Sequence, residues 1–141
     1  MATTEGAIVD RIRDLLASAA VGFHEATGRD FDLTPADQID QAFVVSYISE
    51  APIGQMGMNE EARGRVQIDL ARARNNDEPV AIRAAHDDAR TLISALVRDG
   101  AVTSGEYAVE TAGRTLEIEA PDGAAYVRLR LTLPVSFEAT I

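Results

Sequence analysis

The sequence contains no cysteine and no tryptophan, and arginine supplies all 13 of its basic residues apart from two histidines. The absence of cysteine excludes disulfides, thiol nucleophiles and Cys-ligated metal sites. Aromatic residues make up only 5% of the chain, so we expect a core of Leu, Ile, Val and Ala. No apolar run approaches the roughly 20 residues of a membrane-spanning helix, and the charged first segment does not resemble a signal peptide. We therefore expect a soluble, cytoplasmic chain.

The net charge of the chain argues against two kinds of partner, nucleic acids and anionic membranes. The chain has 23 acidic and 13 basic residues, a net charge of −10. A tight nucleic-acid binder needs clustered cationic side chains, whereas these arginines are scattered among acids. An acidic surface is also repelled by anionic membranes. We expect neither a tight nucleic-acid complex nor membrane contact.

The last part of the chain carries the clearest structural pattern. From Tyr126 to Phe137, apolar and polar residues alternate, which predicts a long strand with one buried face. Burying its apolar side chains contributes on the order of 10 kcal/mol before conformational entropy is subtracted. Pro134 cannot donate to a ladder, so the pattern predicts an edge strand or a bulge there.

The rest of the chain predicts a single α+β domain over residues 1–141. Apolar residues at helical spacing indicate a first helix around Ile8–Leu16 that covers a sheet, and a second helix from Pro79 to Asp99-Gly100. Strands are expected at Gln41–Ser49, Arg63–Arg74, Tyr107–Glu110 and Arg114–Glu119, with a polar loop at Gly28–Asp40. The order α-β-β-α-β-β predicts a mostly antiparallel sheet packed against helices.

The segment Glu50–Ala62 is longer than hairpin loops usually are, since these need only about 2–5 residues. The segment contains two methionines, whose flexible side chains suit adaptable partner surfaces, and two glycines, which permit backbone mobility. We interpret this segment as a partner-docking loop, and the alternative is a surface loop whose methionines pack back onto the sheet. The docking residues would be Ile53, Gly54, Met56, Gly57 and Met58.

A search for catalytic chemistry finds no complete signature. His86 precedes Asp87 and Asp88, but a second histidine at a supporting spacing is missing, so we expect a half-buried structural histidine. No serine lies in a nucleophile elbow, and the glycines near Met56 lack the lysine of a phosphate-binding loop. Glu117 and Glu119 fit a solvated strand face. We expect no enzymatic activity, no catalytic residue, no metal and no cofactor.

The order of the elements resembles that of the tail terminator proteins of long-tailed bacteriophages, and of their relatives in gene transfer agents and phage-derived particles. The resemblance covers most of the chain, as a pattern of hydrophobicity and order rather than a single motif. The segments that carry it are Ile8–Leu16, Phe43–Val45, Arg65–Ile68, Asp88–Leu96 and Tyr126–Phe137.

This resemblance implies a structural virion protein that forms a homohexameric ring. Such a ring caps the tail tube and contacts the head-completion or connector protein, and DNA passes through it without specific binding. It would be assembled in the bacterial cytoplasm and lie in the virion tail. An alternative hypothesis is an acidic dimeric chaperone of the type III secretion class that binds an extended client. A third is an enzyme of the α+β sandwich type, for which nucleophile, base and metal ligands are missing.

Overall fold

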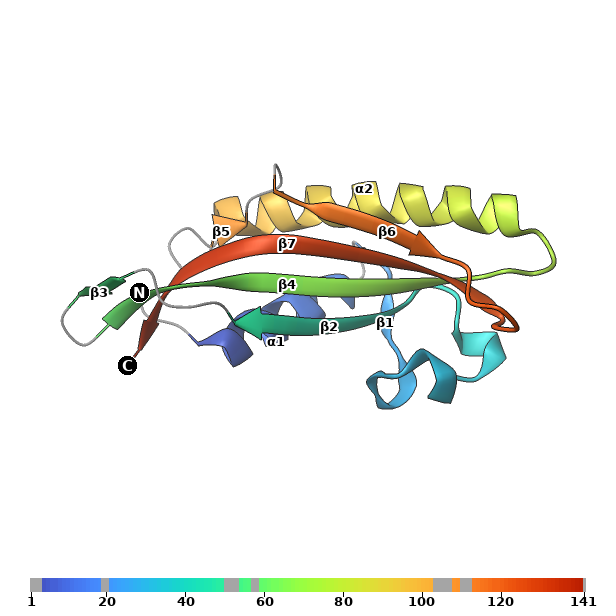
Figure 1. Ribbon diagram of the computed structural model, residues 1–141, viewed down its shortest axis with the longest axis horizontal. Coiled ribbons are helices and arrows are strands. Elements are labelled where there is room, and N and C mark those ends of the chain that lie inside the picture. Colours follow the sequence, from blue (N-terminus) through green and yellow to red (C-terminus); the bar gives the residue numbers. More distant parts are fainter. Residues whose placement is uncertain are drawn as a thin grey trace.

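The computed structural model describes residues 4–18, 21–49, 54–56, 59–102, 108–109 and 113–140 (Figure 1). These residues form two α-helices and a seven-stranded, mostly antiparallel sheet, which confirms the predicted α+β fold. The elements are α1 (Glu5–Leu16), β1 (His24–Glu25), β2 (Ala42–Ser49), β3 (Gly54–Met56), β4 (Asn59–Ala73), α2 (Glu78–Val102), β5 (Ala108–Val109), β6 (Thr115–Glu119) and β7 (Tyr126–Thr140). Three short 3-10 helices lie between β1 and β2, at Thr27–Arg29, Phe31–Leu33 and Ala36–Gln38.

The sheet is built around the antiparallel pair β4 and β7. These strands stay in register from Asn59 opposite Thr140 to Ala73 opposite Tyr126. The strand order is β1-β2-β4-β7-β5, with β3 also paired to β4 and β6 also paired to β7. The predicted long final strand is therefore confirmed, and it continues beyond Phe137.

Both alternatives predicted at Pro134, an edge strand or a bulge, are wrong, since β7 is not an edge strand and pairs residue for residue with β4 through Arg65 opposite Pro134. β7 runs through the interior of the sheet, with β4 on one side and β5 and β6 on the other. Pro134 lies between Thr132, which pairs with β6, and Val135, which pairs with β5. No described strand pairs with Pro134 on that side, so a residue without an N–H is tolerated in the middle of the sheet.

Both helices pack on the same face of the sheet (Figure 1). Thr4 caps α1, accepting a hydrogen bond from the backbone N of Ala7 at 3.2 Å. One continuous core joins the two helices to alternate residues of β2, β4 and β7. Its members include Ile8, Ile12, Leu16, Phe43, Val45, Val66, Ile68, Leu70, Ala85, Ala89, Leu92, Leu96, Leu129, Leu131, Leu133, Val135 and Phe137.

Two element boundaries differ from the prediction. α2 continues through Gly100 to Val102, because one glycine costs a helix only about 1 kcal/mol relative to alanine. β4 begins at Asn59 rather than Arg63, and residues 54–56 pair with residues 59–61. Part of the predicted loop is thus a short hairpin at the end of the sheet.

A smaller apolar cluster lies on the opposite face, at one end of the sheet. There the 3-10 segment covers Ala42, Ala71 and Tyr126, and Phe31 meets Tyr126 edge-on with ring centroids 5.4 Å apart. The parallel strand β1, which the sequence did not predict, precedes this segment and is joined to α1 by a hydrogen bond from Arg13 Nη2 to Glu25 Oε1 at 2.9 Å. The remainder of this face is not covered by a described helix.

Candidate functional site: the uncovered sheet face and the groove beside α2

The uncovered face presents polar residues in rows across the strands. In one row, Asp69 of β4 lies opposite Arg130 of β7, and Arg130 lies opposite Glu117 of β6. In the next row, Gln67 lies opposite Thr132. The alternation that buries every second residue of these strands under the helices places these side chains on the other face.

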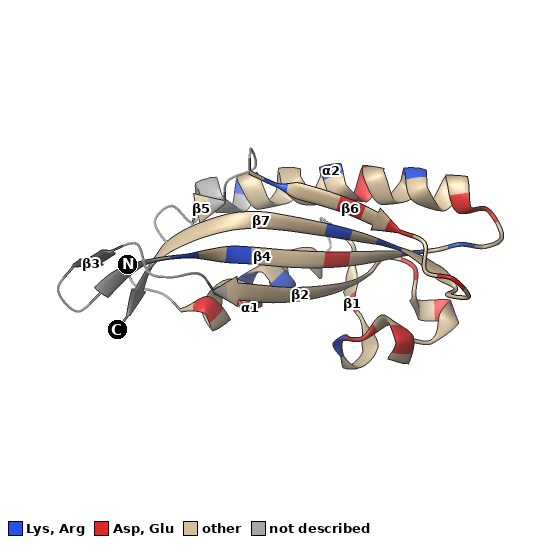
Figure 2. Cartoon of the chain, viewed as in Figure 1, with Lys and Arg blue, Asp and Glu red and all other residues tan. Residues whose placement is uncertain are grey.

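The charges on this face are largely matched in pairs. Arg130 donates to both carboxylate oxygens of Asp69, from Nε at 2.9 Å and from Nη2 at 3.2 Å. The hydrogen bond to Asp69 raises the pKa of Arg130. Arg128 forms a second ion pair with Glu119. Figure 2 shows acidic and basic residues interspersed on the described part of the sheet, and these residues form no cationic stripe of the kind that a phosphate backbone requires.

A third ion pair lies on the helix side. Arg72 donates to Asp88 of α2 from Nε at 2.6 Å and from Nη2 at 2.7 Å, and its Nη1 lies 3.4 Å from Asp40. The hydrogen bond to Asp88 raises the pKa of Arg72. Asp88 is 5% exposed and the side chain of Arg72 is 22% exposed, so this pair joins α2 to β4 at a partly buried site.

The structure separates the His86-Asp87-Asp88 motif. Asp88 points into the ion pair with Arg72, whereas His86 and Asp87 are exposed. The prediction of a half-buried His86 is therefore wrong, because this turn of α2 directs Ala85, Asp88 and Ala89 inward. Within the described ranges, no group of three or more His, Asp or Glu side chains is arranged to hold a metal ion.

A groove runs between α2 and β6, with a volume of about 690 Å³. Basic and apolar side chains line it together. The lining residues are Pro79, Ile82, Arg83, His86, Asp87, Ala89, Arg90, Ile93, Arg114 and Leu116. The sequence did not predict this groove, although Arg83 and Arg90 are seven residues apart and so share one side of the helix.

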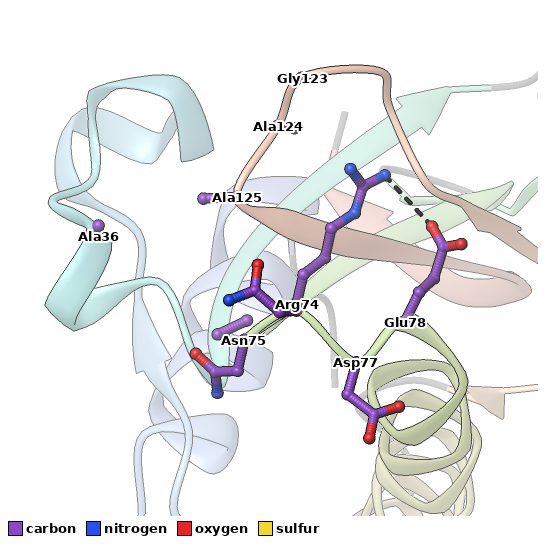
Figure 3. Close-up of a pocket in the computed structure, with 10 residues that line it drawn as sticks. Ala36, Arg74, Asn75, Asp77, Glu78, Gly123, Ala124 and Ala125 are labelled. Atoms are coloured by element: carbon purple, nitrogen blue, oxygen red, sulfur yellow. Dashed lines mark ion pairs between the residues drawn. The ribbon is translucent and has the colours of Figure 1, made fainter.

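A second pocket of about 510 Å³ lies where β4 turns into α2 (Figure 3). Arg74 reaches across it and donates from Nη2 to the carbonyl oxygen of Pro121 at 2.9 Å, and the same atom lies 3.4 Å from Glu78 Oε1. Asn75 and Asn76 make the turn with positive φ angles of 47° and 60°. Asp77 and Glu78 also line this pocket, and the guanidinium of Arg74 is already bonded to Pro121 and Glu78. These contacts fix the turn between β4 and α2, and they leave no free cationic group for an anion among the described lining residues.

The predicted docking loop is described only in part. Gly54 and Met56 belong to strand β3, whereas Ile53, Gly57 and Met58 lie outside the described residues. Their role in docking stays a prediction. The carboxylates Glu117 and Glu119 lie on exposed positions of β6, as the sequence predicted for a solvated strand face.

No protein-family model matches the sequence, and a search of curated proteins finds no match either. Among the described residues, no helix is both long enough and apolar enough to span a bilayer.

Proposed function

We propose that this chain is a structural protein of a phage-like tail, a tail terminator that assembles as a ring of about six copies on the end of the tail tube. The observation that carries the proposal is the order of the elements. A covering helix, two long antiparallel strands, a main helix and a second strand pair follow one another in the structure, as in the family that the sequence resembles.

The distribution of polar groups also supports a structural role. The one buried charged side chain among the described residues is Asp88, and it is used in the bidentate pair with Arg72. On the uncovered face, Arg130 is likewise paired with Asp69. Groups that are paired to one another in this way stabilise the fold and are poorly placed to act on a substrate. We therefore propose a protein that is not an enzyme.

The net charge of −10 suits the proposed position in a tail. DNA passing through a ring of acidic subunits is repelled from the wall rather than held. The proposed partners are the tail tube protein, the head-completion or connector protein and further copies of this chain, with no membrane and no specific contact to DNA. The proposed location is the virion tail, after assembly in the bacterial cytoplasm.

The residues near Met56 are the proposed contact to the tube or connector. Replacing residues 53–58 with a short Gly-containing turn should leave the melting midpoint nearly unchanged, because the paired length of β4 and β7 remains. Joining of tails to heads, or termination at the correct tail length, should fall. Full assembly activity in the shortened protein would remove the docking role, and a large loss of stability would show that the methionines pack in the core.

The experiment that tests the proposal is complementation of tail assembly. Particles assembled without the protein should carry tails of irregular length that do not join heads, and adding the purified chain should restore both. A purified chain that instead remains dimeric and retains an extended peptide from the lysate would favour the secretion-chaperone function.

A further inference from the structure

The groove between α2 and β6 is lined by apolar side chains together with three arginines, one histidine and one aspartate, Asp87. We call Ile82, Ile93 and Leu116 its apolar floor, and Leu116 is 40% exposed. Arg83 and Arg90 stand on the helix side and form no ion pair with any residue that the structure describes. Exposed apolar surface beside arginines that have no described ion-pair partner suits an acidic partner that carries an apolar side chain.

A segment of matching chemistry protrudes elsewhere on the same chain. Leu33, at the end of the second 3-10 helix, is 64% exposed, more than any other large hydrophobic residue described. Asp30, Asp32 and Asp37 surround it in sequence and are all exposed. We call Leu33 with these three aspartates the acidic knob.

The acidic knob is held on a defined platform. Phe31 is buried against Tyr126, whose hydroxyl donates to Asp32 Oδ1 at 3.1 Å. Thr34 Oγ1 donates to the carbonyl oxygen of Asp30 at 2.9 Å and accepts from the backbone N of Thr27 at 3.0 Å. Because these bonds fix the backbone around Leu33, little conformational entropy remains to be lost when the knob binds.

The knob lies on the sheet face away from the helices, whereas the groove lies on the helix side. The knob leads into β2, near one edge of the sheet, whereas the groove borders β6 at the other edge (Figures 1 and 2). A chain therefore cannot fill its own groove. A contact between unlike patches on successive copies is heterologous, and such contacts generate closed rings when the rotation between copies closes.

We propose that the acidic knob of one copy occupies the α2–β6 groove of the next, with Leu33 on the apolar floor and the aspartates facing Arg83 and Arg90. This inference rests on the proposed ring function for the expectation that the chain self-associates. It adds the interface, the polarity of assembly and the residues on each side.

The test uses two variants, each damaged on one side of the contact. The groove variant is Arg83→Glu with Arg90→Glu, and the knob variant is Leu33→Arg with Asp37→Arg. All four positions are exposed, and no hydrogen bond or ion pair of Asp37 is described, so both variants should fold. Arg98→Glu, on the same helix outside the groove, and Asp122→Arg, in the β6–β7 turn, are the matched charge controls.

Sedimentation of the parent at low ionic strength should show oligomers, and the two controls should behave like the parent. Each variant alone should associate about tenfold or more weakly. An equimolar mixture of the knob variant with a neutral groove variant, Arg83→Gln with Arg90→Gln, should form one-to-one dimers and nothing larger. Only one intact knob and one intact groove can meet there, and the glutamines give the mutated groove no charge complementary to the mutated knob. About 0.5 M salt should weaken the parent's association, since the contact depends on charge.

Folding is checked by circular dichroism and the melting midpoint, and Arg83→Gln with Arg90→Gln provides a milder groove variant. Parent-like association of the folded groove and knob variants would overturn the inference. So would a mixture that stays monomeric, or a parent that is monomeric at its highest soluble concentration. None of these results affects the tail-assembly experiment, so failure of the interface and failure of the proposed function are distinguishable.

Discussion

The two faces of strand β7 differ in almost every physical respect, although they belong to the same stretch of chain. Leu129, Leu131 and Leu133 point toward the helices and are at most 1% exposed. Arg128, Arg130 and Thr132 point the other way and remain partly open to solvent. The helix-covered face of β7 therefore carries the main core, whereas most of its other face stays partly open to solvent.

The largest loss of stability should follow from truncating a buried side chain on the helix-covered face of β7. Leu131→Ala should reduce the free energy of unfolding by about 2–5 kcal/mol, because Leu131 is fully buried between the sheet and α2. Chemical denaturation measures the loss. Thr132→Ala, one residue along and on the uncovered face, is the control and should cost far less. Equal costs at the two positions would contradict the assignment of the faces.

The next largest effect should come from the ion pair on the covered side. Arg72→Met leaves the carboxylate of Asp88 buried without its partner and should cost about 2–3 kcal/mol. The double variant Arg72→Met with Asp88→Leu removes both charges and should recover much of this loss in denaturant unfolding. A double variant as unstable as Arg72→Met alone would show that packing, not the unpaired charge, causes the loss.

The corresponding change on the uncovered face should be smaller. Arg130→Met breaks the pair with Asp69, whose side chain is 13% exposed and partly reached by water, and should cost about 1 kcal/mol. Raising the salt concentration should reduce the difference in free energy of unfolding between parent and variant, because screening weakens the ion pair in the parent. A cost equal to that of Arg72→Met would mean that the two faces are equally shielded from solvent.

The smallest effect on stability should come from the ionisation of Tyr126 at high pH. Burial, followed by the hydrogen bond to Asp32, raises the pKa of Tyr126. A raised pKa in the folded state contributes stability that is fully present below the unfolded value of about 10 and is lost as pH rises through the folded value. The melting midpoint should therefore fall above about pH 10, and less steeply in Tyr126→Phe. Parallel curves for the two proteins would remove Tyr126 as the cause.

The fold was predictable from the sequence where side-chain periodicity alone decides structure. The alternation in β7 and the helical stripe around Leu92 are local patterns, and both are confirmed. The interior place of β7 was not predictable from Pro134, because pairing depends on which distant strands reach it. The 15-residue length of β4 was missed for the same reason, since its first residues are polar and are held by β3 and β7.

The candidate surfaces were less predictable than the fold. The sequence singled out His86 because of its neighbours, but the rotation of α2 turned it outward, away from the core. Leu33 looked like one residue of a polar loop, and only the burial of Phe31 and the hydrogen bonds of Thr34 show that it is presented on a fixed platform. Surfaces depend on which residues the tertiary fold leaves exposed, which a local pattern does not contain.

Native mass spectrometry of the purified chain, followed by negative-stain imaging of the same sample, tests the central claim most directly. A tail terminator should give closed rings of about six copies of the 15.1 kDa chain, in solution or on added tail tubes. A chain that is strictly dimeric under every condition, with no ring in the images and no ring on the tubes, would contradict it.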